Sequence, residues 1–230
     1  MKQRLITAAF GIPLFIGIVV SPPAVLFAIT FVLFLIGMDE IRRGLQKAEE
    51  RLAQMLKLLI WLYPLLLFSL PFLRALPPSN TYPGAPDNGA RLFLCAVFSV
   101  WATDSFAYFG GKAFGKTKLA PKVSPNKTVE GSLVGAAFGI GFGALFGWLL
   151  LDKVPVGIFV GTVTAFAGQA GDLLESAIKR KLGIKDLGGL LPGHGGVLDR
   201  FDSLMVVCSL LVLLYQIPMF HALLPWFIKY

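Results

Sequence analysis

Seven long apolar runs that carry almost no charge are the feature that most constrains the fold of this chain. A helix needs about 17 to 25 apolar residues to cross a bilayer, and the runs are close to that length. With 56% hydrophobic and 15% charged residues, the chain has more apolar surface than one soluble core of 230 residues can bury. We therefore predict an all-α polytopic integral membrane helical bundle of about seven transmembrane helices. The predicted spans are residues 5–20, 22–38, 58–73, 92–111, 131–151, 154–171 and 203–228.

The distribution of Lys and Arg predicts an orientation, because these residues stay on the cytoplasmic side when loops are short. With a cytoplasmic N-terminus, four basic segments lie inside and hold 17 of the 21 cations. They are the N-terminus with Lys2 and Arg4, the linker 39–57, the loop 112–130 and the segment 179–202. We expect a multi-pass protein of the bacterial inner (plasma) membrane whose active site faces the cytoplasm.

The linker 39–57 has apolar residues at helical spacing opposite a charged face. That pattern is typical of an amphipathic helix lying on the membrane, and a solvated connector explains it equally well. We expect two parts of the chain. Residues 1–75 form a transmembrane hairpin, this interfacial linker and the third span, and residues 91–230 form a catalytic membrane domain.

Glycine recurs at every fourth position of the fifth predicted span, from Gly131 to Gly147. Small residues at this spacing let helix backbones approach closely in a membrane. We favour a helix contact over a substrate groove. The contact forms within the chain or between two copies, so a homodimer through transmembrane helices stays open.

The segment 176–202 packs charge and glycine between two apolar segments. It contains five cations, three carboxylates and a Pro-Gly-His-Gly-Gly turn, which are the groups that hold phosphates and a hard metal ion. Asp172 and Glu175 lie just upstream, and together with Ser176 and Lys179 they recur at helical spacing on one face. Charged residues at membrane depth are functional by default.

The spacing in this segment resembles the phosphatidate cytidylyltransferase family, also called CDP-diacylglycerol synthase. That family's pattern is Ser-x-x-Lys-Arg, Lys-Asp, Pro-x-His-Gly-Gly and Asp-Arg-x-Asp in this order. The positions that fill it here are Ser176, Lys179, Arg180, Lys185, Asp186, Gly188, Pro192, His194, Gly195, Gly196, Asp199, Arg200 and Asp202. An earlier block, residues 124–131, is similar to the family's Ser-Pro-x-Lys-Thr-x-Glu-Gly, although Asn126 stands where relatives often have Lys.

The resemblance implies an enzyme that joins CTP and phosphatidic acid to give CDP-diacylglycerol and pyrophosphate. Membrane lipids are expected partners, and nucleic acid is not. The lipid phosphate would attack the α-phosphorus of CTP in line. We expect a phosphate clamp and hydrogen-bond donors around the two substrates. The clamp comprises Lys122, Lys127, Lys179, Arg180, Lys185 and Arg200, and the donors are Ser124, Thr128 and His194, with Gly195 and Gly196 opening the backbone amides to phosphate.

Carboxylates at helical spacing predict a Mg²⁺ site, with a second cation also conceivable. Asp172 ends the sixth span, while Asp199 and Asp202 share a face at the start of the seventh. Mg²⁺ prefers a few carboxylates plus phosphate oxygens, so these three are the predicted ligands. The alternative is that they cap helices or pair with Arg180 and Arg200. Asp104, inside the fourth span, is expected to face the site.

Two other functions fit parts of the pattern. An ion-coupled transporter would use Asp104 and Asp172 as a relay, but the cations cluster in loops on one side and no repeated half is found. Another CTP-dependent lipid-phosphate transferase also stays possible. A CDP-alcohol phosphotransferase is disfavoured because its spaced Gly and Asp pattern is absent from the sequence.

Overall fold

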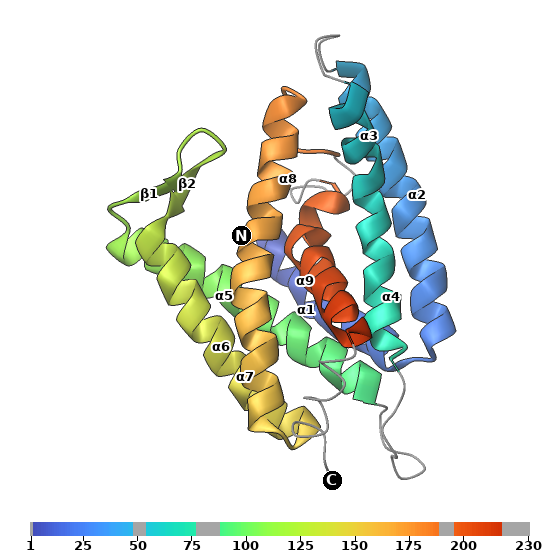
Figure 1. The fold of residues 1–230 in the computed structure, drawn as a ribbon, viewed down its shortest axis with the longest axis vertical. Helices are drawn as coiled ribbons and strands as arrows, with labels where there is room; N and C mark the ends of the chain where they lie inside the picture. The colour runs from blue at the N-terminus through green and yellow to red at the C-terminus, as the bar shows by residue number, and fades with distance from the viewer. Residues whose placement is uncertain (1, 48–53, 77–87, 189–195, 218–230) are drawn as a thin grey trace.

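The fold is a helical bundle with one short β-hairpin (Figure 1). The computed structural model describes residues 2–47, 54–76, 88–188 and 196–217. Its helices are α1 (Lys2–Val20), α2 (Pro23–Lys47), α3 (Gln54–Leu62), the 3-10 helix η1 (Tyr63–Phe68), α4 (Ser69–Arg74), α5 (Asn88–Phe114), α6 (Val129–Leu151), α7 (Val154–Val163), the π-helical η2 (Thr164–Gly168), α8 (Gln169–Lys181) and α9 (Leu198–Gln216). Strands β1 (Lys118–Ala120) and β2 (Ser124–Thr128) pair antiparallel.

Five helical stretches of this part of the chain are long and apolar enough to cross a membrane, as expected for a polytopic protein. They correspond to the second to sixth predicted spans and cover Pro23–Gln46, Lys57–Arg74, Asn88–Phe114, Val129–Leu151 and Val154–Lys181. Helices α1 and α9, the first and seventh predicted spans, are not among them, and residues 218–230 of the seventh lie outside the described residues. The all-α class is confirmed, whereas the count of seven stays a prediction.

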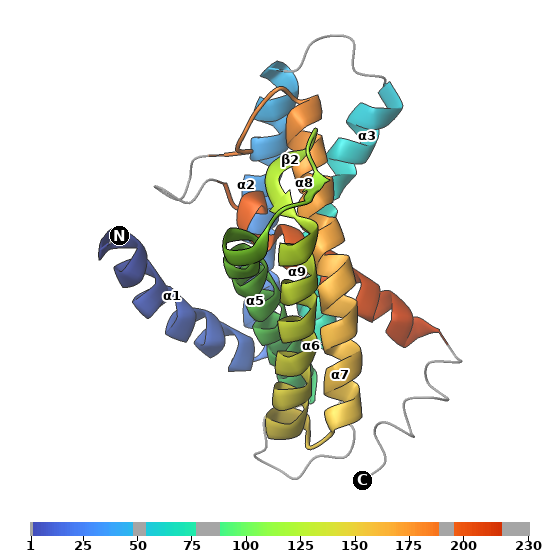
Figure 2. The same ribbon diagram turned by 90° about the vertical axis from the view of Figure 1, so that its left-hand side faces the viewer.

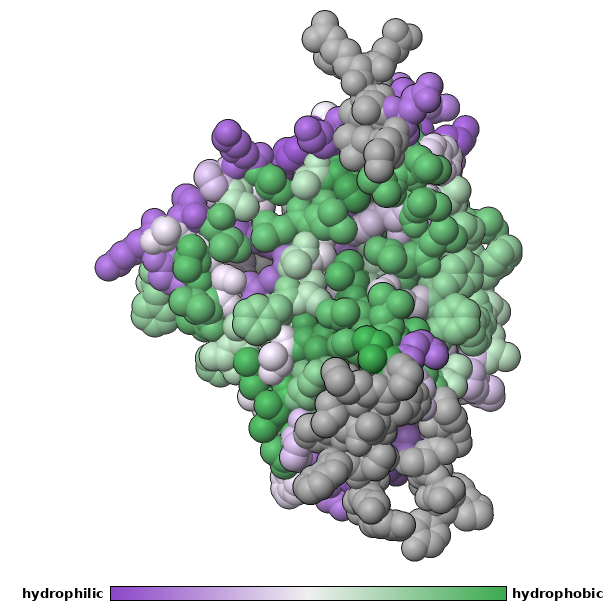
Figure 3. Space-filling model, viewed as in Figure 1, coloured by the Kyte–Doolittle hydropathy of each residue, from purple (hydrophilic) through white to green (hydrophobic). Residues whose placement is uncertain are grey.

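Helix α5 lies in the bundle against α6 and α4, and α6 packs in turn against α7. The first half of α5 is largely buried, with Phe93 and Cys95 fully inside the core. Apolar side chains instead cover much of the outer surface (Figure 3), including Leu133 and Phe138 on α6. Such a surface fits a protein surrounded by lipid, because soluble monomers rarely expose large contiguous apolar patches. Helix α1 slopes away from the bundle (Figure 2).

The glycine stripe of α6 is buried and serves a contact within the chain. Its first three glycines meet α5, where a Cβ on Gly135 would lie 2.6 Å from the Thr103 carbonyl oxygen. Its last two, Gly143 and Gly147, meet α7 at Gly157. The predicted helix contact is confirmed. Both neighbours belong to this chain, so the stripe is not free to serve a dimer.

We expect Gly143→Ala to lower the free energy of unfolding by about 1–3 kcal/mol, the usual cost of overpacking. The added Cβ would lie 2.7 and 2.8 Å from the Cα and N of Gly161, and backbone cannot move aside cheaply. Gly141→Ala is the matched control, since nothing lies within 4 Å of its Cβ position. Thermal unfolding in detergent compares the two. Equal midpoints would contradict the close packing of α6 on α7.

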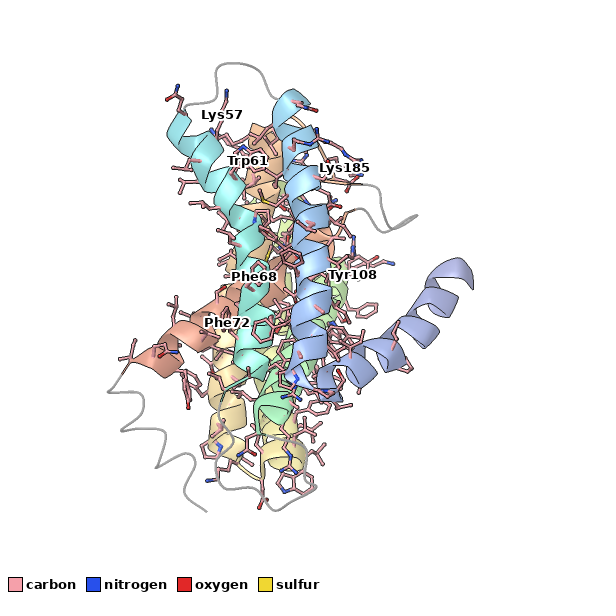
Figure 4. The ribbon with its side chains drawn as sticks, turned by 90° about the vertical axis from the view of Figure 1, so that its right-hand side faces the viewer. Lys57, Trp61, Phe68, Phe72, Tyr108 and Lys185 are labelled. Carbon is pink, nitrogen blue, oxygen red and sulfur yellow. The ribbon has the colours of Figure 1, made fainter. Side chains whose placement is uncertain are left out.

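The polar segments gather at one end of the bundle. The last turns of α2, the start of α3 with Lys57, and the end of α8 near Lys185 lie there together (Figure 4), and the hairpin lies on the same side of α5 (Figure 1). Three of the four segments that the sequence groups as cytoplasmic therefore share an end. Arg74 lies at the opposite end, where its Nε donates to the Val19 carbonyl at 2.6 Å.

Two local predictions differ from the structure. Residues 39–47 of the linker do not form a separate surface helix, because α2 continues through them and buries Ile41 completely. Asp39 supports that extension by pairing with Arg42 and Arg43 one turn later. The loop 112–130 is also more regular than expected, since α5 runs to Phe114 and the hairpin follows. Residues 48–53 lie outside the described part. The division into residues 1–75 and 91–230 stays a prediction.

Candidate active site

A pocket of about 430 Å³ opens between α5, the hairpin, α6 and α8 near the polar end. Charged groups and apolar surface share its wall, a combination suited to a ligand with a charged head and an apolar tail. It is lined by Asp104, Ala107, Tyr108, Gly111, Lys112, Leu119, Asn126, Lys127, Thr128, Ser132, Gln169 and Asp172. Asp104, which the sequence predicts to face the site, lines this pocket together with Lys127, Thr128 and Asp172.

The earlier motif block forms β2 and the start of α6, and hydrogen bonds hold its shape. Thr128 caps α6, because its Oγ1 accepts a hydrogen bond from the Gly131 amide at 3.2 Å. Glu130 reaches back to the chain before β1 and accepts from the Lys116 and Thr117 amides at 3.0 and 3.1 Å. Glu130 therefore positions the hairpin, and Thr128 both caps the helix and lines the pocket.

Lys127 joins the earlier motif block to helix α8, which leads into the second block. Its Nζ lies 2.5 Å from Oδ2 of Asp172, and the two side chains keep 28% and 31% of their surface exposed. Asp172 Oδ1 also accepts a long hydrogen bond from Ser176 at 3.4 Å. An ion pair that stays partly open to solvent can exchange partners when a phosphate or a cation arrives. Residues 45 positions apart thus form one polar centre.

A π-helical turn, η2, interrupts the long helix just before Asp172. Such turns are rare in proteins, and those that occur are often found at functional sites. After it, the Gln169 Nε2 donates to the Ala165 carbonyl at 2.7 Å and to the Ser132 carbonyl at 3.3 Å, tying α8 to α6. Our sequence reasoning missed Gln169 and Ser132. A glutamine inside an otherwise apolar predicted span was the available signal.

Behind the pocket lies a buried network of Lys179 with two carboxylates. Its Nζ is 2.8 Å from both Glu175 Oε2 and Asp199 Oδ1, and the exposed fractions of the Lys179, Glu175 and Asp199 side chains are 13%, 1% and 4%. The second oxygen of Asp199 accepts from the Gly196 and Leu187 amides at 2.7 and 3.1 Å. Burial alone would raise the pKa of Asp199, but Lys179 and these donors hold it below its ordinary value.

This network differs from the predicted roles of its members. Lys179 is engaged by two carboxylates and is not free to clamp a phosphate in this arrangement. Both oxygens of Asp199 accept hydrogen bonds from N–H donors, so a metal ion would compete with these donors for them. The Gly196 amide points to Asp199 and not toward a phosphate. Lys179, Asp199 and Gly196 therefore bond to one another and do not line the pocket.

The predicted metal ligands do not form a ready-made group. Among the residues that the structure describes, no three His, Cys, Asp or Glu side chains could hold a metal ion together. Asp172 and Asp202 nevertheless lie close enough for their charges to interact, and the same holds for Asp104. Two carboxylates fit Mg²⁺ when substrate phosphates supply the other oxygens. The donor chemistry thus fits Asp172 and Asp202 better than Asp199.

The remaining predicted site residues lie around this centre. Arg180 donates from Nε to the Val123 carbonyl at 3.2 Å, so it joins α8 to the hairpin. Lys122, Lys185 and Arg200 are exposed at the polar end, outside the pocket lining, and Ser124 is half-buried in β2. His194 and Gly195 lie outside the described residues.

Comparison with known proteins shows the family of the chain. The sequence profile of the cytidylyltransferase family matches residues 63–218. A phosphatidate cytidylyltransferase of Staphylococcus aureus (strain COL) is 44% identical over 133 residues, which are 56% of this chain and 51% of the relative. That of Bacillus subtilis (strain 168) is 46% identical over 126 residues, or 53% and 45%. The chain spans about half the length of the curated relatives that it matches. Since the profile covers more than half of the chain, including both motif blocks and the pocket, the protein belongs to the cytidylyltransferase family.

Proposed function

We propose that the protein is a phosphatidate cytidylyltransferase, which transfers CMP from CTP to phosphatidic acid and releases CDP-diacylglycerol and pyrophosphate. The observation that carries the proposal is the Lys127–Asp172 pair, which joins the earlier motif block to helix α8 at a pocket with polar and apolar walls. The names of the relatives support the same reaction. The position of the pocket near the polar end suits one substrate from water and one from the membrane.

In this proposal, basic residues of the pocket bind the phosphates and apolar residues bind the lipid. A phosphate oxygen of the lipid forms a bond to the α-phosphorus of CTP while the bond to the leaving pyrophosphate breaks. Lys127 and Lys112 supply positive charge beside the phosphates, and Lys185 and Arg200 extend this field at the surface. Tyr108, with 66% of its surface exposed, and Leu119 offer apolar contacts for the lipid.

The proposal includes Mg²⁺ as the cofactor, with Asp172 and Asp202 as its protein ligands and Asp199 positioned behind them. When bound, the ion neutralises charge on the transferring phosphates. A second cation would need a further ligand set from the substrates. The same proposal places the protein in a bacterial inner membrane with its active site facing the cytoplasm. The shared end of the basic segments and the bacterial relatives support this orientation. A homodimer is proposed only through helix faces other than the α6 stripe.

The experiment that tests the function is product formation by the purified protein in detergent. Labelled CTP and phosphatidic acid should give labelled CDP-diacylglycerol in a Mg²⁺-dependent reaction. Parallel reactions with other lipid phosphates test the alternative, which is a CTP-dependent transferase that acts on a different lipid phosphate. Product from another lipid phosphate and none from phosphatidic acid would overturn the choice of substrate.

We expect Lys127→Ala to raise the apparent KM for CTP about tenfold or more, because a charged hydrogen bond to phosphate contributes about 1.5–3 kcal/mol. Lys118→Ala is the matched control, since Lys118 is exposed on the neighbouring strand and does not line the pocket. Initial rates over a range of CTP concentrations measure both. If the two variants behave alike, CTP does not bind beside Lys127.

A further inference from the structure

Glu40 on α2 is a buried acid that lies outside the segment matched by the family profile. Only 4% of its surface is exposed. Its Oε1 accepts a hydrogen bond from the Val197 amide at 2.8 Å, and its Oε2 accepts from the Leu198 amide at 3.1 Å. These amides belong to the first turn of α9, whose N–H groups have no partner within the helix and favour a negative charge.

Two glycines of the α8–α9 connection close around this carboxylate. A Cβ added to Gly188 would lie 2.6 Å from Cδ of Glu40, and one added to Gly196 would lie 2.7 Å from the same atom. Real Cβ atoms essentially never come so near another heavy atom. Gly188 precedes the Pro-Gly-His-Gly-Gly turn in the sequence, and Gly196 is its last residue. Glu40 therefore gives a physical reason for glycine at both positions.

Glu40 and Asp199 hold the same connection from opposite sides. Asp199 accepts from the Gly196 and Leu187 amides, while Glu40 accepts from the next two amides along the chain. Asp199 in turn carries the ion pair with Lys179. Four amide hydrogen bonds to two acids thus hold the connection and the start of α9, and Asp202 follows one turn later on the same helix.

We propose that Glu40 is a positioning residue, which fixes the first turn of α9 and the chain at Gly188 and Gly196 so that Asp199 and Asp202 keep their places at the active centre. The N-terminal helix α2 is then part of the catalytic apparatus and not only a membrane anchor. The catalytic part of this inference rests on the proposed function. The structural part does not, because it concerns where the turn is held.

The first test compares Glu40→Gln with Asp39→Asn. Glutamine keeps the shape of the acid but places an N–H₂ group against one of the two amides. Asp39 is the neighbouring acid and pairs only with Arg42 and Arg43 in the described contacts. We expect Glu40→Gln to lower kcat at least about tenfold, to leave the KM for CTP within about twofold, and to speed amide exchange in peptides covering 196–203 about tenfold. Asp39→Asn should change none of these.

The second test uses Gly188→Ala, alone and together with Glu40→Ala. In the presence of the acid, the added methyl group must push the carboxylate away, and exchange in 196–203 should accelerate. In the Glu40→Ala background the same methyl group meets no carboxylate, so it should add nothing, and the two effects are non-additive. Additive effects, or wild-type exchange in Glu40→Gln, would overturn the proposal. If the protein turns over no CTP, the proposed function fails, and the exchange measurements still decide whether Glu40 holds the turn.

Discussion

Asp172→Asn should lower turnover at least about 100-fold while the protein still inserts and purifies. Asparagine keeps the shape of aspartate and removes the charge that faces Lys127 at 2.5 Å. The proposed Mg²⁺ would lose a ligand, and Lys127 would lose the partner that positions it. The stabilisation asked of such a centre is several kcal/mol, and about 2.7 kcal/mol already corresponds to a 100-fold change in rate.

Asp152→Asn is the matched control for this variant. Asp152 ends α6 at the far end of the bundle in a left-handed conformation, with φ at 56°, which asparagine adopts as readily. Turnover at saturating CTP, measured over a range of Mg²⁺ concentrations, compares the two. Near-normal turnover of Asp172→Asn at limiting Mg²⁺ would mean that the ion is held elsewhere.

Asp199→Asn distinguishes two possible roles of Asp199, which are binding Mg²⁺ and positioning the connection before α9. If Asp199 binds Mg²⁺, as the sequence pattern indicates, a higher Mg²⁺ concentration should restore part of the lost activity. If it acts through Lys179 and the backbone of the connection, as the hydrogen bonds indicate, extra Mg²⁺ should restore nothing. We expect the second result, together with faster amide exchange around residue 196.

Patterns with local causes were predictable from the sequence. Charge-free runs predicted the helices that could cross a membrane, and the spacing of glycine predicted the close contacts of α6. The sequence also assigned Lys127 and Asp172 to one candidate site, and the structure pairs them. In each case the relevant information lies within one helix or in a spacing that chemistry restricts.

Contacts between distant segments were not predictable in the same way. Glu40 lies 157 residues before Val197, in a stretch whose charge pattern also fits a surface helix. Spacing put Lys179 on a face with Asp172 and Glu175, but only the packing of α8 on α9 decides that it pairs with Asp199. The short strand β2 contains Pro125 and Asn126, which are unfavourable in strands, so its pairing with β1 depends on tertiary context.

Lys179→Met should lower the free energy of unfolding by about 3–5 kcal/mol, because it leaves buried Glu175 and Asp199 facing each other without a cation. Methionine keeps most of the length of the side chain, so the change removes charge more than volume. Lys181→Met is the matched control, since Lys181 is exposed two residues further on the same helix. Unfolding in detergent measures both, and equal stability of the two variants would contradict the buried network.

The pH dependence of this loss gives a second, independent check. Because the pKa of Asp199 lies below its ordinary value of 3.8, its ion pair contributes fully above that value and is lost as the pH falls through the lower folded value. In Lys179→Met, buried Asp199 has no cation beside it, and its protonation at low pH removes an uncompensated buried charge. The stability difference between wild type and Lys179→Met should therefore narrow as the pH falls from about 7 to about 4. A difference that stays constant with pH would mean that lost packing, and not uncompensated charge, causes the destabilisation.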